Sequence, residues 1–248
     1  MLGLSRQIVD EVKRALYEKG LSDAQIMIVS IHTHTGPALK YHEGCGGVDP
    51  EFVKTVAGKI IRACLEAIGD ARPVTALYGA FSPLMGDYAY NRACPEGPVD
   101  HMVRGFILKR GGARPIAAAS FACHAVSRGR VSGVSADYPG ALNALLEKRG
   151  YEPIYLNGLC GDIDPFVAPE QDRDERLNAF AAAIETAFFK TLTPLPLTLS
   201  AGRLSFTLLH EKVTREQIRS AADAAVARAG GETEAAAHVA RIWEKEML

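Results

Sequence analysis

The sequence predicts an α/β fold in which a mixed β-sheet is flanked by α-helices and the site loops lie at strand ends. Short β-rich runs alternate with amphipathic helical patterns, which is typical of α/β domains. Two of the runs flank Gly111-Gly112, a pair that favours a β-hairpin and so an antiparallel part of the sheet. Because no internal repeat or linker divides the chain, a single domain over residues 1–248 is expected.

The predicted elements follow one another closely along the chain. Ser5 is expected to cap a first helix that ends at Gly20, and Asp49 with Pro50 begins a second one that runs to about Ile68. The other predicted elements are strands at 26–31, 73–81, 103–110, 114–123, 153–156 and 195–209, and helices at 137–148, 173–190, 214–229 and 233–248.

Composition excludes several classes of protein. Lys and Arg (28) nearly balance Asp and Glu (29), so no strong field indicates binding to nucleic acid or an anionic membrane. No apolar run approaches the roughly 18 residues of a membrane span, and the N-terminus lacks the pattern of a signal peptide. Five cysteines without paired spacing indicate free thiols and a reducing compartment, which favours the cytoplasm.

The motif with the clearest chemistry is IMIVSIHTHTGP, residues 26–37. Its apolar run predicts a buried strand, and alternation along an extended chain directs His32 and His34 to the same side. Gly36 and Pro37 end the strand there, which puts both rings at its carboxyl end. Two imidazoles on one side are half a metal site, although they are also compatible with two polar residues that merely open a loop.

Three further loops after predicted strands carry unusual residues. Since loops from neighbouring strands meet at one edge of a sheet, we expect these residues to lie near the histidines, although polar residues also gather in loops by chance. They are Asn91 and Arg92, His124, and Asp162 with Asp164.

Zinc chemistry accounts for this combination of residues. His32 and His124 would supply two neutral imidazoles, and a third ligand is still needed. The one-residue spacing of Asp162 and Asp164 puts both carboxylates on one side of an extended turn, so one could ligate while the other accepts a proton. Alternatively, Asp162 only orders a tight turn, and Arg92 is a surface residue instead of a substrate anchor.

Cysteine offers a competing chemistry. A Cys/His metal site or a thiol nucleophile is conceivable, because four cysteines lie in or beside these loops: Cys45, Cys94, Cys123 and Cys160. None forms a Cys-x-x-Cys pair, so buried, inert thiols are the preferred interpretation. Four histidines have no partner by spacing and are expected to be surface or hydrogen-bonded residues: His42, His101, His210 and His238.

Four segments, in order, resemble the catalytic domain of the neutral/alkaline non-lysosomal ceramidase family. They are IHTHTGP, the pair Asn91-Arg92, FACHAVSRGRVSGVSADYPG and GLCGDIDP, and the resemblance covers most of residues 4–210. It implies that His32 and His124 bind a catalytic zinc ion. It also implies that His34 and Arg92, with Asn91 beside it, lie in the substrate pocket.

The chain departs from this family in three ways. Asp164 stands where the family has a serine that is important for amide hydrolysis, so a true ceramidase is not expected. The family's remaining zinc ligands, a glutamate and a tyrosine, come from a region that would lie beyond residue 248. The family's first strands also have no counterpart, so residues 1–248 are expected to be a core segment of the ceramidase-like catalytic domain, with one sheet edge left bare.

These features predict a metal-hydrolase-like protein. The expected function is zinc-dependent hydrolysis of an amide or related acyl bond in an unidentified small substrate, such as a lipid or an acylated amine. Metal-bound water would be the nucleophile, with catalytic roles for His34, Asp162 and Asp164. The alternative is a non-catalytic binding or accessory module that retains the fold and a partial metal site. A bare sheet edge also predicts a homo-oligomer, or an edge covered by the C-terminal helices.

Overall fold

The computed structural model describes residues 3–41, 47–129, 133–166, 172–198, 200, 202, 204–205, 207, 209, 212–231 and 234–248, and of residues 235–236 the backbone alone. These residues belong to two compact units, one containing most of the chain up to residue 201 and the other most of the chain after it. The single catalytic domain expected over residues 1–248 stays a prediction. Three residues discussed above lie outside the described ranges: His42, Cys45 and His210.

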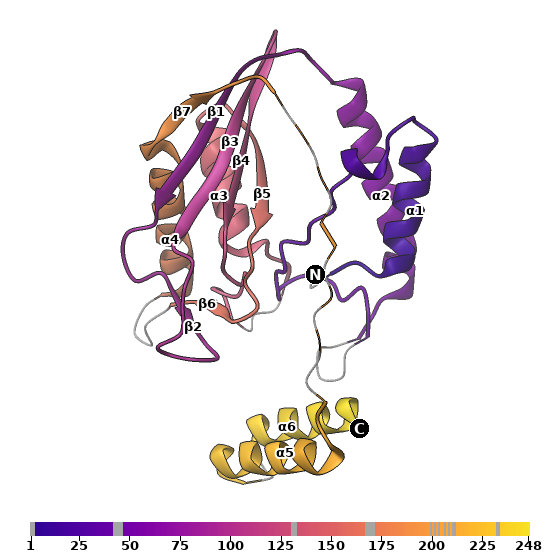
Figure 1. Cartoon of the computed structure of the whole chain (residues 1–248), viewed down its shortest axis with the longest axis vertical. Coiled ribbons are helices and arrows are strands. Elements are labelled where there is room, and N and C mark those ends of the chain that lie inside the picture. The colour runs from indigo at the N-terminus through magenta and orange to yellow at the C-terminus, as the bar shows by residue number, and fades with distance from the viewer. Residues whose placement is uncertain are drawn as a thin grey trace. The chain divides into compact units, whose positions relative to one another are not determined.

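A five-stranded mixed sheet lies at the centre of the first unit (Figure 1). Its order is β5-β4-β3-β1-β7, and every neighbouring pair is antiparallel except β4 and β5. The predicted hairpin around Gly111-Gly112 joins β3 to β4 and is confirmed. The strands are β1 (Val74–Pro83), β3 (Met102–Arg110), β4 (Ala113–Phe121), β5 (Glu152–Asn157) and β7 (Leu192–Leu195).

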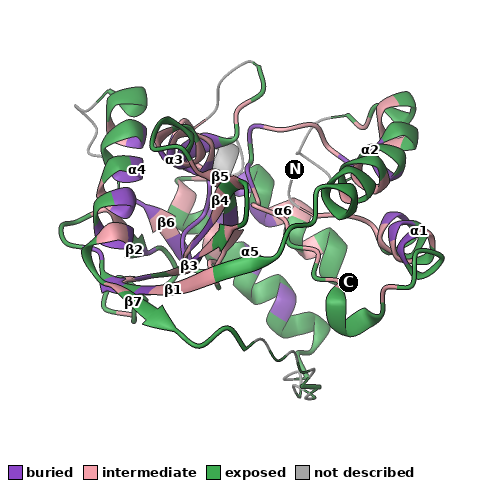
Figure 2. Cartoon of the chain, turned by 90° about the horizontal axis from the view of Figure 1, so that it is seen from above, coloured by how far each residue is buried: buried purple, intermediate pink, exposed green. Residues whose placement is uncertain are grey.

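Helices α3 (Asp137–Lys148) and α4 (Arg173–Lys190) lie side by side on one face of this sheet (Figure 2). Helix α3 connects β4 to β5, as a parallel strand pair requires a crossover of this kind. The core between sheet and helices is aromatic, and fully burying each such side chain contributes about 1.5–3 kcal/mol to stability. Its largest members include Phe121, Tyr138, Phe180 and Phe188. The predicted α/β class, a mixed sheet flanked by helices, is confirmed.

The opposite face of the sheet carries exposed apolar side chains. Residues that pair across strands point to the same face, and the register aligns Gly79 with Phe106, Phe106 with Ala118, and Ala118 with Ile154. Phe106 is 37% exposed and Ile154 44% exposed. Within the described residues, β5 pairs only with β4, so it is an edge strand.

Helices α1 (Arg6–Tyr17) and α2 (Pro50–Gly69) pack against each other through their apolar faces. The predicted caps are confirmed, because Ser5 accepts a hydrogen bond from the backbone N–H of Ile8 and Asp49 accepts two at the start of α2.

The strand predicted over residues 26–31 is wrong. A single 3₁₀ turn (Asp23–Gln25) precedes the segment, which is extended but pairs with no strand in the described part of the chain. Its side chains do alternate, since Ile26 and Ile28 pack against the α1–α2 cluster whereas Met27 is 73% exposed. Alternating burial of side chains indicates an extended chain. A β-strand also needs a neighbouring strand that forms hydrogen bonds with its backbone groups.

Two short strands lie inside predicted loops. Strand β2 (Ala89–Asn91) pairs antiparallel with β6 (Ile163–Pro165), so that Tyr90 lies opposite Asp164. This small sheet ties the long loop after β1 to the turn after β5, which brings together two of the four loops expected to carry the site.

The strand predicted over residues 195–209 is also wrong. Strand β7 ends at Leu195, and the described residues between 196 and 209 belong to no strand. Leu204 and Leu209 are 85% and 94% exposed, so no sheet face buries these two leucines.

The second unit contains the helices α5 (Arg215–Ala229) and α6 (Ala235–Met247), which pack against each other. Both were predicted, and Thr214 caps α5 by accepting a hydrogen bond from the backbone N–H of Gln217. Small residues at the contact, Ala237 and Ala240 from α6 against Val226 from α5, allow the helices to approach closely. No described helix is long and apolar enough to cross a membrane.

Candidate metal centre

Three histidines from two distant segments gather at one point of the first unit. One ligand nitrogen from each of His32, His34 and His124 lies within 4.8 Å of the other two. The ring centroids are 4.9–5.5 Å apart and the ring planes are steeply inclined to one another. The structure therefore brings together the His-x-His motif and the histidine that follows β4, about 90 residues later.

Residues 33–35 are anchored to the segments that precede α3. The hydroxyl of Thr33 donates to the backbone oxygen of Ser135 (2.8 Å), and the N–H of Ser135 donates to the oxygen of Thr35 (2.8 Å). The N–H of His34 donates to the oxygen of Ala125, next to His124. These bonds replace the predicted strand as the reason why the two segments meet.

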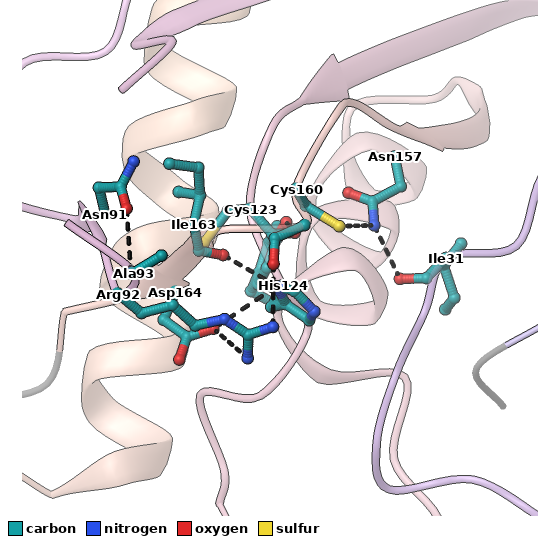
Figure 3. Close-up of polar contacts among 12 residues, drawn as sticks. Ile31, Asn91, Arg92, Ala93, Cys123, His124, Asn157, Cys160, Ile163 and Asp164 are labelled. Atoms are coloured by element: carbon teal, nitrogen blue, oxygen red, sulfur yellow. Dashed lines mark hydrogen bonds and ion pairs between the residues drawn. The ribbon is translucent and has the colours of Figure 1, made fainter. Parts of the chain in front are cut away.

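His124 is buried and its ring orientation is fixed by one carbonyl group. The oxygen of Ile163 accepts a hydrogen bond from the backbone N–H of His124 (2.9 Å) and lies 3.1 Å from its ring Nδ1 (Figure 3). Since a carbonyl oxygen only accepts, Nδ1 carries the proton. The other nitrogen, Nε2, is then unprotonated and able to bind a metal ion.

The surroundings keep two of these imidazoles neutral. Partial burial, followed by the nearby rings of His32 and His124, lowers the pKa of His34 to about 4. Burial also lowers the pKa of His124, and the positive charge of Arg92 acts in the same direction, against the carbonyl of Ile163 and the carboxylate of Asp164. Neutral imidazole is the form that ligates metals, so both rings suit this role at neutral pH.

Asp164 and Arg92 lie beside His124, on its Nδ1 side. The Oδ1 atom of Asp164 is 3.5 Å from Nδ1 of His124 and 3.5 Å from Nη1 of Arg92 (Figure 3). Arg92 also donates from Nη2 to the oxygen of Gly161 (2.9 Å). Among the described residues no carboxylate joins the three-histidine group, so Asp164 contacts a ligand candidate instead of supplying the third ligand expected from Asp162 or Asp164.

Asn91 and Asp162 hold the loops together. The Nδ2 group of Asn91 donates to Asp162 Oδ2 (2.8 Å) and to the oxygen of Pro98 (3.2 Å), and its Oδ1 accepts from two backbone N–H groups, of Ala93 and Cys94. The side chain of Asn91 is therefore fully engaged and buried. For Asp162, these contacts favour the interpretation as a turn-ordering residue.

The cysteines and remaining histidines do not form a second site in the described part of the chain. Its four cysteines are free thiols. Burial raises the pKa of Cys123 and, less strongly, that of Cys160, which disfavours a thiolate nucleophile. His101 and His238 are exposed, as expected.

The three histidines fit a zinc ion. Two nitrogens on a tetrahedral zinc ion lie about 3.4 Å apart when each bond is about 2.1 Å, so the present spacing has to close by roughly an ångström. Three imidazoles with one open position are a known catalytic donor set for zinc. Sequence patterns did not single out Asn157, whose side-chain amide contacts the backbone oxygen of Ile31. The only sequence feature that could have indicated it is the Asn-Gly pair after a predicted strand.

Comparisons with known proteins support the fold. No family model matches the sequence, and no curated protein matches it. Among solved structures, the chain is similar to the neutral ceramidase from Pseudomonas aeruginosa, with a TM-score of 0.63 and 17% sequence identity. The match covers 74% of this chain and 34% of the ceramidase, so the chain spans about a third of that protein's length.

Fold and site together define a class of protein. The chain has a mixed α/β, ceramidase-like fold that carries a three-histidine group able to hold a metal ion.

Proposed function

We propose that this chain carries the zinc site of a hydrolase that cleaves an amide or related acyl bond in a small substrate, such as a lipid or an acylated amine. The observation that carries the proposal is the convergence of His32, His34 and His124, whose ligand nitrogens lie within 4.8 Å of one another. The similarity in fold to a neutral ceramidase supports a hydrolase, and Asp164 in place of the family's serine argues against ceramidase activity proper.

The three histidines would be the ligands, with His34 in the third position. His34 is the most exposed of the three, so solvent reaches the group beside its ring. When bound there, zinc would lower the pKa of a coordinated water to about 7 and polarise a carbonyl group.

Arg92 and Asp164 would serve the substrate and the ligand shell. The side chain of Arg92 is 42% exposed, and its five N–H donors exceed its contacts with Gly161 and Asp164, so it can also donate to a substrate carbonyl oxygen. The negative charge of Asp164, 3.5 Å from Nδ1 of His124, would stabilise the protonated Nδ1 whose hydrogen bond goes to Ile163, and Asp164 is the candidate to accept a proton during hydrolysis. We assign Asn91 to the support of Arg92 instead of to direct contact with substrate.

One observation favours the alternative of a binding or accessory module. Asp162 is bound to Asn91, and no carboxylate of the described residues lies within the three-histidine group. A site without a well-placed base can hold a metal ion, and a ligand on it, without turnover.

Metal content and activity of the purified chain test the proposal. We expect about one zinc per chain by elemental analysis and hydrolysis of N-acylated amines, both lost in His124→Ala. The matched control is His101→Ala, which changes an exposed histidine outside the group. A wild type without stoichiometric zinc contradicts the metal site. Stoichiometric zinc without hydrolysis across a panel of acyl amides supports the binding module.

We also propose that the chain forms a homo-oligomer. In the described residues β5 is an edge strand with a free side, and Ile154 on it is 44% exposed. Sedimentation velocity should give a dimer or larger species that Ile154→Lys weakens. A monomeric wild type at micromolar concentration contradicts this proposal.

A further inference from the structure

Asn157, the last residue of β5, connects three segments of the first unit (Figure 3). Its Nδ2 atom lies 3.3 Å from the backbone oxygen of Ile31 and 3.2 Å from the sulfur of Cys160. Its Oδ1 atom lies 3.3 Å from the hydroxyl of Tyr155. One amide thus links the end of β5, the turn after it, and the residue that precedes His32.

The neighbours determine which way this amide faces. A backbone carbonyl only accepts hydrogen bonds, so the atom nearest Ile31 must be the amide nitrogen. The two N–H groups of Asn157 then serve two acceptors, Ile31 and Cys160. The carbonyl oxygen of the amide is the atom that lies beside the hydroxyl of Tyr155.

The Ile31 carbonyl belongs to the peptide plane that determines the φ angle of His32. That angle is +59°, a left-handed conformation that few non-glycine residues adopt and that costs free energy because of the Cβ atom. Such a conformation persists where contacts hold it, often at functional sites. The bond from Asn157 holds the peptide plane from the side that precedes His32.

The residues after His32 are held independently. Thr33 donates to Ser135, and His34 donates through its backbone to Ala125. With both sides fixed, the His32 ring is directed toward His34 and His124, whose ring centroids lie 5.1 and 4.9 Å from it.

The residues that pack beside Asn157 belong to the hydrophobic core. The hydroxyls of Tyr138 and Tyr155 are 2.7 Å apart and both residues are buried. Tyr138 donates to the oxygen of Cys123 (2.8 Å), beside His124, and Tyr155 lies 2.9 Å from the oxygen of Phe121. The amide therefore rests on rigid side chains, as a residue that orients a metal ligand requires.

We infer that Asn157 is a positioning residue of the metal centre, which sets the direction of the His32 imidazole through the Ile31 carbonyl. This inference rests on the proposed zinc site. It adds a residue that touches neither metal nor substrate and acts on one ligand alone.

The test compares Asn157→Asp with Asn143→Asp. The first change keeps the shape of the side chain but removes both N–H donors and sets a carboxylate against the Ile31 carbonyl. Asn143 is a half-buried asparagine of α3 whose Oδ1 has no hydrogen-bond partner among the described residues, so it controls for the chemical change alone. By titration calorimetry we expect zinc to bind about 10- to 100-fold more weakly to Asn157→Asp. Asn143→Asp should stay within about twofold of the wild type.

A second readout needs no metal. In NMR spectra of the chelator-treated protein, the backbone amide resonances of His32 and Thr33 should shift or broaden in Asn157→Asp and in Asn157→Ala. In Asn143→Asp they should stay in place. Circular dichroism identifies a variant that has lost its fold, in which case Asn157→Ala decides. Unmoved His32 resonances in a folded variant overturn the inference, as does zinc affinity equal to that of the wild type. If the wild type binds no zinc, the proposed function fails while these resonances still decide the role of Asn157.

Discussion

The Oδ1 atom of Asp164 lies 3.5 Å from Nδ1 of His124, the ring nitrogen opposite Nε2, which is the candidate metal ligand. The same oxygen is 3.5 Å from Nη1 of Arg92 and has no hydrogen-bond partner in the described residues. A carboxylate behind a histidine ligand fixes the ring and raises its basicity. Asp164 thus contacts one of the three clustered histidines.

Asp164→Asn should weaken zinc binding without unfolding the protein. The amide keeps the shape of the side chain but loses the negative charge next to the Nδ1 proton, and loss of such a partner typically lowers metal affinity 10- to 100-fold. Calorimetric titration with zinc measures the effect. Asp162→Asn is the matched control, because its carboxylate binds Asn91 and not a histidine, so its zinc affinity should change less than about threefold. Equal losses in both variants would contradict the assignment.

Asn91→Ala should destabilise the first unit. The change removes four hydrogen bonds of a side chain that is only 4% exposed, including the acceptor of the backbone N–H groups of Ala93 and Cys94. A hydrogen bond contributes about 0.5–1.5 kcal/mol net, so the loss of all four should lower the free energy of unfolding by about 2 kcal/mol or more. Denaturant unfolding measures it, with the exposed Asn178→Ala as control. A loss below about 0.5 kcal/mol would contradict the prediction that the Asn91 side chain stabilises the first unit.

Gly105→Ala should disrupt the central sheet. A Cβ atom at this position of β3 would lie 2.0 Å from the oxygen of Ala118 and 2.6 Å from the ring of Phe188. Because a backbone atom of β4 cannot move aside cheaply, we expect a loss of at least about 3 kcal/mol or an insoluble product. Gly111→Ala in the hairpin turn meets nothing closer than 3.8 Å and should unfold at nearly the wild-type denaturant concentration.

Elements with local signals could be predicted from sequence, and elements that depend on distant partners could not. The caps at Ser5, Asp49 and Thr214 begin helices as expected, because a cap acts on its own first turn. Strands β2 and β6 escaped prediction because each is three residues long and exists through pairing across more than 70 positions, as between Tyr90 and Asp164. Residues 26–31 failed for the converse reason, since they have the alternation without a partner strand.

The candidate site also contains residues that could be predicted from sequence and contacts that could not. The histidines could be singled out because His-x-His and a histidine after a strand are visible patterns, and the structure brings them together. The supporting contacts could not. Asn157 contacts Ile31 across 126 positions, and the proton on His124 is assigned through a carbonyl of Ile163, whose side chain carries no signal. Hydrogen bonds that orient the histidines depend on backbone atoms, which sequence patterns do not distinguish.

The stability of the metal-free protein should fall as the pH is lowered from 7 to 4, in part because of His34. Its pKa is about 4 in the folded state, below the 6.5 of an imidazole in an unfolded chain, because partial burial and the rings of His32 and His124 disfavour the charged form. Between these two values the unfolded chain binds a proton at this position and the folded chain does not. Protons therefore favour unfolding in this window, and the contribution is absent above about pH 6.5.

The comparison that isolates this effect is His34→Asn, which keeps a polar side chain that cannot titrate. With chelator present, the denaturation midpoint of the wild type should decrease more steeply between pH 6.5 and 4 than that of His34→Asn, while the two curves run parallel above pH 7. His238→Asn, at an exposed position of α6, should follow the wild type. If His34→Asn shows the same slope as the wild type, His34 titrates equally in both states, and its ring is not held among the other two histidines in the metal-free protein.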